Sequence, residues 1–332
     1  MFGRLLDRLR GRYTRLDEQD IERAIDSILE ATDPRLRFVR GYRRKLRKPV
    51  VRSLVYVDDL VERIPGPFEI SRKTYGSNPQ VNALFGSADD IGALFASSHM
   101  LQDFFRDRPD CEQVCVPLYM LRQEKHVLGM ALSGDIVRRD VARTAVNFSG
   151  HRLGIVCAAG EHELRSSLKW RGIHTLAVTA LEHIARMKTR TAGLEEERAL
   201  LKMKLRDLEA QHQGLDALPM ATPPGTQARQ SLEQRLADTA LKIQEARTGV
   251  ATLVDYLDQV CQVFNHPSHH LRVRQNSVTV DRMGIKPDEL SHQPGSDVIS
   301  ATITIGERPG LEMIIAAFRR DDMAAAAGGM HT

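Results

Sequence analysis

The end of a long predicted helix carries the residues best suited to bind a metal. Cys261, His266, His269 and His270 fall within ten residues, and thiolate and imidazole groups are the ligands of tetrahedral zinc sites. Two features count against a metal: Cys261 adjoins a buried helical position, and Pro267 restricts the histidines around it. Histidines near a helix end also interact with its last carbonyls and its dipole. We therefore keep these four residues as weak metal candidates and predict neither a metal nor a cofactor.

The rest of the chain offers no recognisable catalytic motif. It has no P-loop, no G-x-G-x-x-G after a predicted strand and no G-x-S-x-G turn. His162 and Glu163 begin an H-E-x-x-H pattern, but Ser166 occupies the place of the second histidine. We predict no catalytic residue, and an enzyme of unrecognised class, with its site between a sheet body and the helical region, is kept as an alternative.

A basic segment near the amino terminus is a second candidate site. No acidic residue occurs from Pro34 to Val57, and Phe38 and Tyr42 lie among the basic residues. This pattern suits a nucleic-acid backbone, an anionic membrane surface or an acidic protein. It also suits an ordinary solvated helix face. Sequence-specific nucleic-acid binding is disfavoured, because no recognition-helix or RNP-type pattern is present. The candidate residues are Arg35, Arg37, Arg40, Arg43, Arg44, Lys45, Arg47, Lys48 and Arg52.

Composition limits the class of protein. The chain has 332 residues, 27% of them charged and 5% aromatic, which suits a soluble protein rich in long helices. The net charge is only +4, yet residues 1–52 hold fifteen Lys and Arg against eight Asp and Glu, so the charge is concentrated at one end. Four cysteines without framework spacing, no secretory signal and no apolar stretch long enough to span a membrane predict a cytoplasmic location.

Apolar residues at alternating spacings of three and four predict two long helices in the middle of the chain. Between them, residues 219–225 contain two adjacent prolines and a glycine, so a continuous helix is excluded. A short connection between long helices predicts an antiparallel coiled-coil hairpin. Its seam is predicted to contain Leu194, Leu201, Leu205, Leu208, Leu232, Leu236, Ile243, Val250, Leu253, Leu257 and Val260.

Two glycines interrupt the predicted arms. Gly193 and Gly249 are equally distant from residue 221 in the connecting segment, so they should face each other across the hairpin. A glycine within a helix costs roughly 1 kcal/mol relative to alanine. We predict a hinge at this level; the alternative is two tolerated glycines.

Alternating apolar residues predict short strands on both sides of the hairpin. Before it, we expect strands at 114–121, 126–132, 142–148 and 152–157, with turns at 123–125 and 149–150. After it, we expect strands at 271–273, 278–282, 298–305 and 313–318, with turns at 275–276 and 306–310. An antiparallel hairpin brings its two ends together, so these segments should form one body.

The predicted fold is α+β. It has a basic helical region at 1–110, with a helix from Asp17 to Ala31 and another from Pro49 to Ile64. A small antiparallel sheet body follows, made of 111–160 and 268–320, with the coiled-coil hairpin at 161–266 inserted between the two β segments and a flexible tail at 321–332.

The function that fits these features best is a non-enzymatic cytoplasmic scaffold for protein–protein interaction. Its hairpin would associate with a second copy or with a protein partner. The alternatives are the unrecognised enzyme and a protein that binds nucleic-acid backbone or an anionic membrane surface through residues 35–52.

Overall fold

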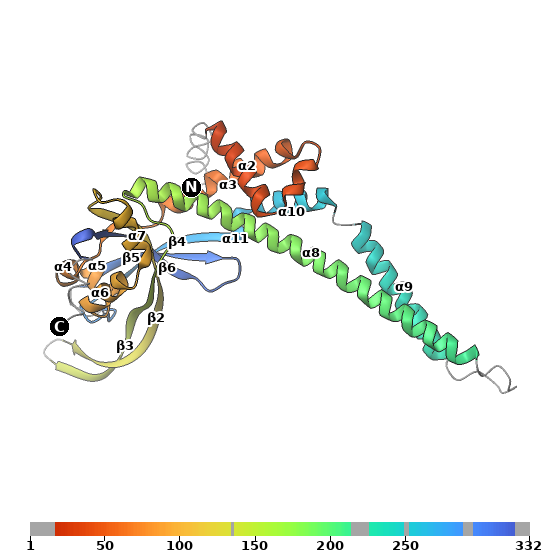
Figure 1. The fold of residues 1–332 in the computed structure, drawn as a ribbon. Helices are drawn as coiled ribbons and strands as arrows, with labels where there is room; N and C mark the ends of the chain where they lie inside the picture. Colours follow the sequence, from red (N-terminus) through yellow and green to blue (C-terminus); the bar gives the residue numbers. More distant parts are fainter. Residues whose placement is uncertain (1–16, 134–135, 214–225, 249–251, 288–294, 323–332) are drawn as a thin grey trace, which may run out of the picture. The chain divides into compact units, whose positions relative to one another are not determined.

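A computed structural model describes residues 17–133, 136–213, 226–248, 252–287 and 295–322 (Figure 1). The predicted α+β class is confirmed. The described chain forms two compact units: unit 1 holds residues 53–173 and 266–322, and unit 2 holds residues 17–52 and 174–265. Residues 17–52 of the predicted amino-terminal region therefore group with the long helices. The predicted tail lies almost wholly outside the described residues.

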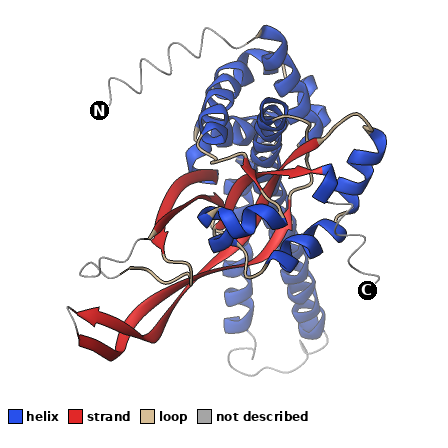
Figure 2. Ribbon diagram, turned by 90° about the vertical axis from the view of Figure 1, so that its left-hand side faces the viewer, coloured by secondary structure: helices blue, strands red, loops and turns tan. Residues whose placement is uncertain are grey.

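One sheet with two long strands organises unit 1 (Figure 2). Its strands are β2 (Gln113–Ser133), β3 (Ile136–Leu153), β4 (Leu271–Val280), β5 (Ser296–Ile305) and β6 (Leu311–Arg319), in the order β3-β2-β6-β5-β4 with antiparallel pairing. The short β1 (Phe68–Glu69) adds a parallel pairing to β6. Since β2 pairs with β6, segments from before and after the long helices share one sheet.

Three predicted turns lie inside strands, so those predictions are wrong. Residues 123–125 continue β2 and pair with 145–147 of β3. Gly150 has a φ of +63° beside an irregularity in the β2–β3 register, so residues 149–150 make a bulge rather than a hairpin turn. Residues 275–276 continue β4 opposite β5. In each case polar residues on an exposed stretch of strand resemble the composition of a turn.

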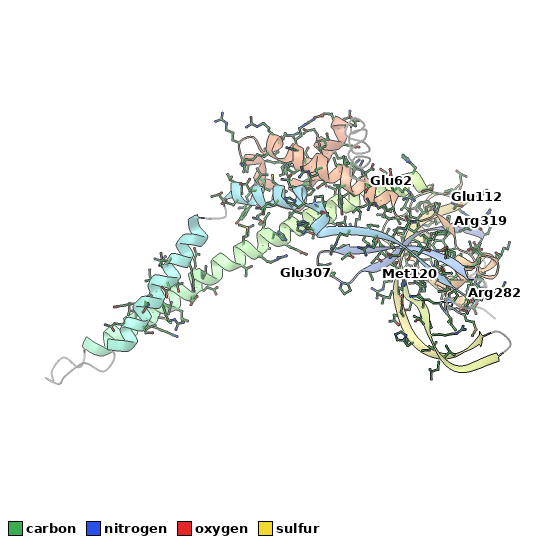
Figure 3. The ribbon with its side chains drawn as sticks, turned by 180° about the vertical axis from the view of Figure 1, so that it is seen from behind. Glu62, Glu112, Met120, Arg282, Glu307 and Arg319 are labelled. Carbon is green, nitrogen blue, oxygen red and sulfur yellow. The ribbon has the colours of Figure 1, made fainter. Side chains whose placement is uncertain are left out.

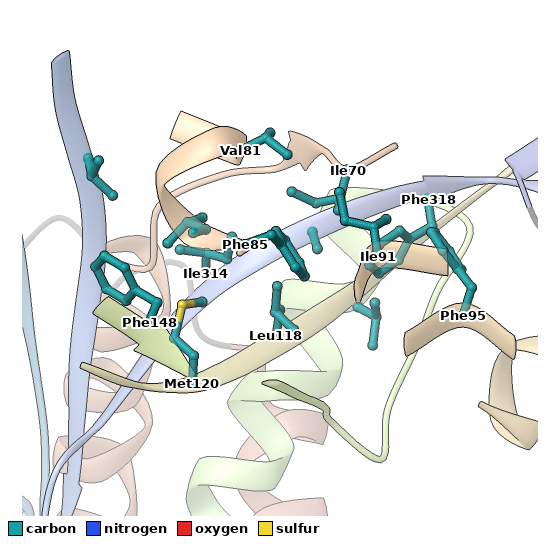
Figure 4. Close-up of a cluster of buried hydrophobic side chains, with 14 of the residues drawn as sticks. Ile70, Val81, Phe85, Ile91, Phe95, Leu118, Met120, Phe148, Ile314 and Phe318 are labelled. Carbon is teal, nitrogen blue, oxygen red and sulfur yellow. The ribbon is translucent and has the colours of Figure 1, made fainter. Parts of the chain in front are cut away.

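Four short helices pack on one face of the sheet and form a core with it (Figure 4). They are α4 (Arg72–Ser77), α5 (Pro79–Leu84), α6 (Ala88–Ala96) and α7 (His99–Asp107). Each begins at a side-chain cap, and the caps are Ser71, Asn78, Ser87 and Ser98. Phe95 of α6 meets Phe318 of β6 edge to face, with ring centroids 4.1 Å apart.

The turn after β4 returns to the ribbon made by β2 and β3. In this turn, where Figure 3 labels Arg282, Gly284 accepts a hydrogen bond from the Val146 N–H at 2.7 Å, and Ile285 bridges Ala145. Lys286 adds an ion pair to Glu124 at 2.8 Å. These contacts give the exposed part of the ribbon a third row of backbone pairing.

Arg165 fixes the end of α3 (Tyr42–Glu62) within unit 1. Its guanidinium donates to the carbonyls of Val61, Ile64 at 3.0 Å and Gly66 at 3.3 Å, and it pairs with Glu161 at 2.7 Å. Carbonyls at a helix end lack helical partners, so this arginine satisfies groups that would otherwise be unpaired.

Unit 2 is helical. It contains α2 (Glu18–Ala31), the 3-10 helix η1 (Pro34–Phe38), the first half of α3, most of α8 (Glu161–Gln213), α9 (Thr226–Thr248) and α10 (Leu253–Asn265). The predicted 17–31 helix matches α2, with Asp17 as its cap. The prediction that a helix begins at Pro49 is wrong, because Pro49 lies inside α3. The short α11 (Pro267–His270) belongs to unit 1.

The predicted second long helix is divided, because α10 has its own start. The Thr252 N–H donates to the Asp255 carboxylate at 2.8 Å, and the Asp255 N–H donates to the Thr252 hydroxyl at 3.3 Å. This reciprocal pair is a capping box, which marks a helix amino terminus. The T-x-x-D pattern is present in the sequence, but the apolar periodicity that runs across it predicts one helix.

The long arm consists of α9 and the part of α8 beside it, which lie side by side in Figures 1 and 2. As a helix of 53 residues, α8 is about 80 Å long. Leu201 of α8 and Thr239 of α9 are only 2% and 3% exposed, as expected where two helices pack. The coiled-coil seam as a whole stays a prediction.

Candidate interaction surfaces

Acidic residues at every fourth position of α2 pair with the predicted basic segment. They are Glu18, Glu22, Asp26 and Glu30, which share one helix face. Their partners come from η1 and α3, and we call the set the ion-pair ladder.

Three arginines complete the ladder. Arg47 pairs with both carboxylate oxygens of Glu18, one of them at 2.6 Å, and this hydrogen bonding lowers the pKa of Glu18. Arg43 pairs with Glu22 and also with Asp26 at 3.4 Å, and Arg37 pairs with Glu30 at 3.4 Å.

Asp33 forms ion pairs with two more basic side chains. Arg35 donates to its carboxylate from Nε at 3.0 Å and Nη2 at 2.7 Å, and Lys188 of α8 approaches to 3.8 Å. Hydrogen bonding from Arg35, with a smaller contribution from Lys188, lowers the pKa of Asp33. The Lys188 ammonium also lies 4.8 Å from the centre of the Tyr256 ring, so this cluster joins η1, α8 and α10.

Two further candidates contact α10. Lys45 pairs with Asp258 at 3.4 Å, and Arg52 donates to the carbonyl of Asn265 at 3.2 Å. Six of the nine predicted anion-binding residues therefore have partners within unit 2. For Arg37, Arg43, Lys45 and Arg47 the sequence did not show this, because their acids lie on other helices.

The remaining three predicted anion-binding residues make no ion pair within the described residues. Arg40, Arg44 and Lys48 are exposed and follow one another at intervals of four residues, just before and along α3. Phe38, in the preceding η1, is 83% exposed. We call these four residues the exposed basic surface.

The weak metal candidates do not form a metal site. Within the described part of the chain, no group of three or more His, Cys, Asp or Glu side chains could hold an ion. The rings of His266 and His269 stack with centroids 5.5 Å apart, and His270 lies beside His269. The thiol of Cys261 instead donates to the carbonyl of Lys45, and burial, with the charge of Asp258, raises its pKa to about 11.

A buried polar network in the sheet was not predicted. The Glu312 carboxylate on β6 accepts hydrogen bonds from Ser300 at 2.5 Å and Thr302 at 2.8 Å, and Asn276 of β4 donates to Thr302. The sequence signal is a single acid at the start of an apolar strand. Both carboxylate oxygens are hydrogen-bonded, and the network has no histidine base, so its evident role is to join three strands.

The arm carries apolar side chains on its outer surface. Leu200 and Met203 of α8 lie one turn apart and are 47% and 57% exposed, and Leu241 of α9 is 57% exposed. Near them, the predicted seam residues Leu194, Leu205, Leu232 and Leu236 are half-buried.

Other seam positions lie nearer the base of the arm or outside the described side chains. Leu257 and Val260 are buried and Leu253 is half-buried, all in α10, whereas the side chains of Leu208, Ile243 and Val250 are not described.

The predicted hinge concerns Gly193 and Gly249. Helix α8 continues through Gly193, where a Cβ atom would meet nothing within 4 Å. Gly249 lies outside the described residues. The hinge therefore stays a prediction.

No protein-family model matches this chain, and comparisons with curated proteins and with solved structures also return no match. Among the described helices, none combines the length and the apolar character that crossing a membrane requires.

Proposed function

We propose that this protein is a non-enzymatic interaction protein whose long arm mediates association. A second copy of the chain is the occupant to test first, and another protein is the alternative. The location remains the cytoplasmic one expected from the sequence.

The observation that carries the proposal is the presence of exposed apolar side chains on both helices of the arm. Leu200 and Met203 supply them from α8 and Leu241 from α9. Single exposed apolar residues are ordinary on protein surfaces, but here they occur on an extended element that makes no part of the sheet core. Two such arms packed together would bury these residues in a helical bundle.

The length of α8, part of which belongs to the arm, supports the same conclusion. A helix of about 80 Å exceeds what is needed to cover a small sheet. Ordering so many residues is costly, and long helices gain most of their stability from packing against other elements. If the two helices of the arm pack only on each other, their outer surface is available to bind a partner.

The experiment is light scattering coupled to size-exclusion chromatography on the full-length chain over a range of concentrations. We expect a dimer or higher oligomer, and conversion to monomer by the triple variant L200K/M203K/L241K. The matched control is L128K/I155K/M283K, which places the same charge on exposed apolar positions of unit 1 and should leave the oligomer intact. A wild-type chain that is monomeric at every concentration would rule out self-association.

A further inference from the structure

We infer that the exposed basic surface, Phe38 with Arg40, Arg44 and Lys48, is a docking surface for the anionic headgroups of a phospholipid bilayer. This inference does not depend on the proposed role of the arm.

Internal ion pairs separate this surface from the rest of the basic segment. Arg43 and Arg47 of α3 are engaged by acids of α2, and Lys45 and Arg52 face α10. The charges of Arg43, Arg47 and Lys45 are largely neutralised by these acids, whereas Arg52 keeps its charge and donates to a main-chain carbonyl of α10. The positive potential that can reach a ligand therefore comes mainly from Arg40, Arg44 and Lys48.

Helix geometry places these charges on one outward face. Leu46, Val50 and Leu54 of α3 are fully buried and define its inner side. At 100° per residue, Arg44 and Lys48 lie about 120° and about 160° around the helix from the middle of that side. The Lys45 N–H donates to the carbonyl of Gly41, so the exposed Arg40 directly precedes the first turn of the helix.

Phe38 distinguishes a lipid surface from other anionic partners. With 83% of its surface exposed, it has almost no packing contact in the protein. A bilayer interface offers an apolar layer for the ring directly beneath the phosphates that attract the basic side chains. Stable attachment to a membrane takes two such signals, one apolar and one electrostatic.

Nucleic acid fits this surface less well. Backbone binding gains affinity from many phosphate contacts, typically six to ten. Three basic residues on one short face supply about half of that number at most. An acidic protein would use the charges but would not explain the exposed aromatic ring.

The test is co-flotation of the full-length protein with phosphatidylcholine vesicles, with and without phosphatidylserine. We expect binding only to the vesicles that contain phosphatidylserine, and loss of binding at high salt. Each basic residue near an anionic surface contributes about 1 kcal/mol, so R40Q/R44Q/K48Q should lower the partition constant about 100-fold. F38A should lower it about tenfold.

The matched control is K73Q/K125Q/R319Q, which removes the same net charge from exposed positions of unit 1 and should bind as the wild type does. Unchanged thermal midpoints of all variants will show that they are folded. Equal binding to neutral and anionic vesicles, or equal loss in the control variant, would overturn the inference. Binding to mixed-sequence duplex DNA that exceeds vesicle binding and is unaffected by F38A would assign the surface to nucleic acid instead.

Discussion

The thiol of Cys261 in α10 donates a hydrogen bond to the main-chain carbonyl of Lys45 in α3, with a distance of 3.8 Å between sulfur and oxygen. In a regular helix this carbonyl would accept from the N–H of the residue four positions later. That residue is Pro49, which has no N–H. The side chain of a neighbouring helix thus provides the donor that the proline lacks, and the carbonyl is satisfied.

Replacing Cys261 by alanine should therefore destabilise the protein by about 1 kcal/mol, because the Lys45 carbonyl loses its donor. Serine keeps a donor and should restore part of the loss. Urea unfolding of the wild type and both variants measures this difference. Equal stability of the alanine and serine variants would show that the hydrogen bond contributes nothing.

The same residue should react slowly with alkylating reagents. With a pKa of about 11, Cys261 at pH 8 has a thiolate fraction about 200-fold below that of an ordinary cysteine. Because the folded-state pKa is raised, the neutral thiol stabilises the fold below its ordinary pKa near 8.5, and this contribution is lost as the pH rises through about 11. Iodoacetamide kinetics on a C111S/C115S/C157S variant would measure both the rate and its pH dependence.

Local sequence signals predicted several elements of the fold. Asp17 followed by apolar residues at helical spacing predicted α2. The glycines at 306 and 310 between two apolar runs predicted the β5–β6 hairpin. These signals succeed because caps and turns depend on neighbouring residues.

Long-range contacts decided the features that the sequence did not reveal. The acids at 18, 22, 26 and 30 have a visible helical spacing, but their pairing with Arg37, Arg43 and Arg47 depends on how two helices meet. Pro49 signals a helix start, yet Cys261 allows it inside α3. A basic segment could thus be recognised from sequence, whereas Arg40, Arg44 and Lys48, whose side chains have no partner among the described residues, could not be singled out.

Two glycines with positive φ should respond differently to alanine. Gly66 has a φ of +116°, and a Cβ atom there would lie 2.3 Å from the carbonyl oxygen of Ile315, a backbone atom that cannot move aside cheaply. Gly41 has a φ of +75° and nothing within 4 Å. We expect G41A to cost about 1 kcal/mol from backbone strain alone, and G66A to cost at least about 3 kcal/mol.

Thermal and urea unfolding of these two variants would test the comparison. The mutation is the same in both, so the difference reports the steric contact at Ile315. Equal losses of stability in G41A and G66A would contradict the close approach seen at Gly66.

His151 should make unit 1 less stable in mildly acidic solution. Its ring stacks on Phe85 with centroids 4.5 Å apart and hydrogen-bonds the carbonyl of Leu84 at 2.8 Å, and burial lowers its pKa. A lowered folded-state pKa means that the neutral ring stabilises the fold above its ordinary pKa near 6.5, and that this stability is lost as the pH falls below that value.

Urea unfolding at several values from pH 7.5 to 5, for the wild type and H151Q, would isolate this contribution. Glutamine can still donate to Leu84 but does not titrate, so its stability should fall less as the pH is lowered. Burial also lowers the pKa of His183. Because His183 is present in both proteins, its contribution to the pH dependence cancels in the comparison. Parallel pH curves for the two proteins would exclude His151 as the titrating group.

The ion-pair ladder predicts opposite outcomes for two adjacent arginines. Arg43 pairs with Glu22 and Asp26, whereas Arg44 makes no ion pair within the described residues. Partly exposed ion pairs contribute up to about 1 kcal/mol each, so R43A should lower the free energy of unfolding by about 1–2 kcal/mol and R44A by less than about 0.5 kcal/mol. Salt should weaken only the effect of R43A, because it screens pairs that exist in the wild type. Both variants remove one positive charge from the same helix, so unfolding measured at low and high salt separates local pairing from net charge, and equal destabilisation would contradict the ladder.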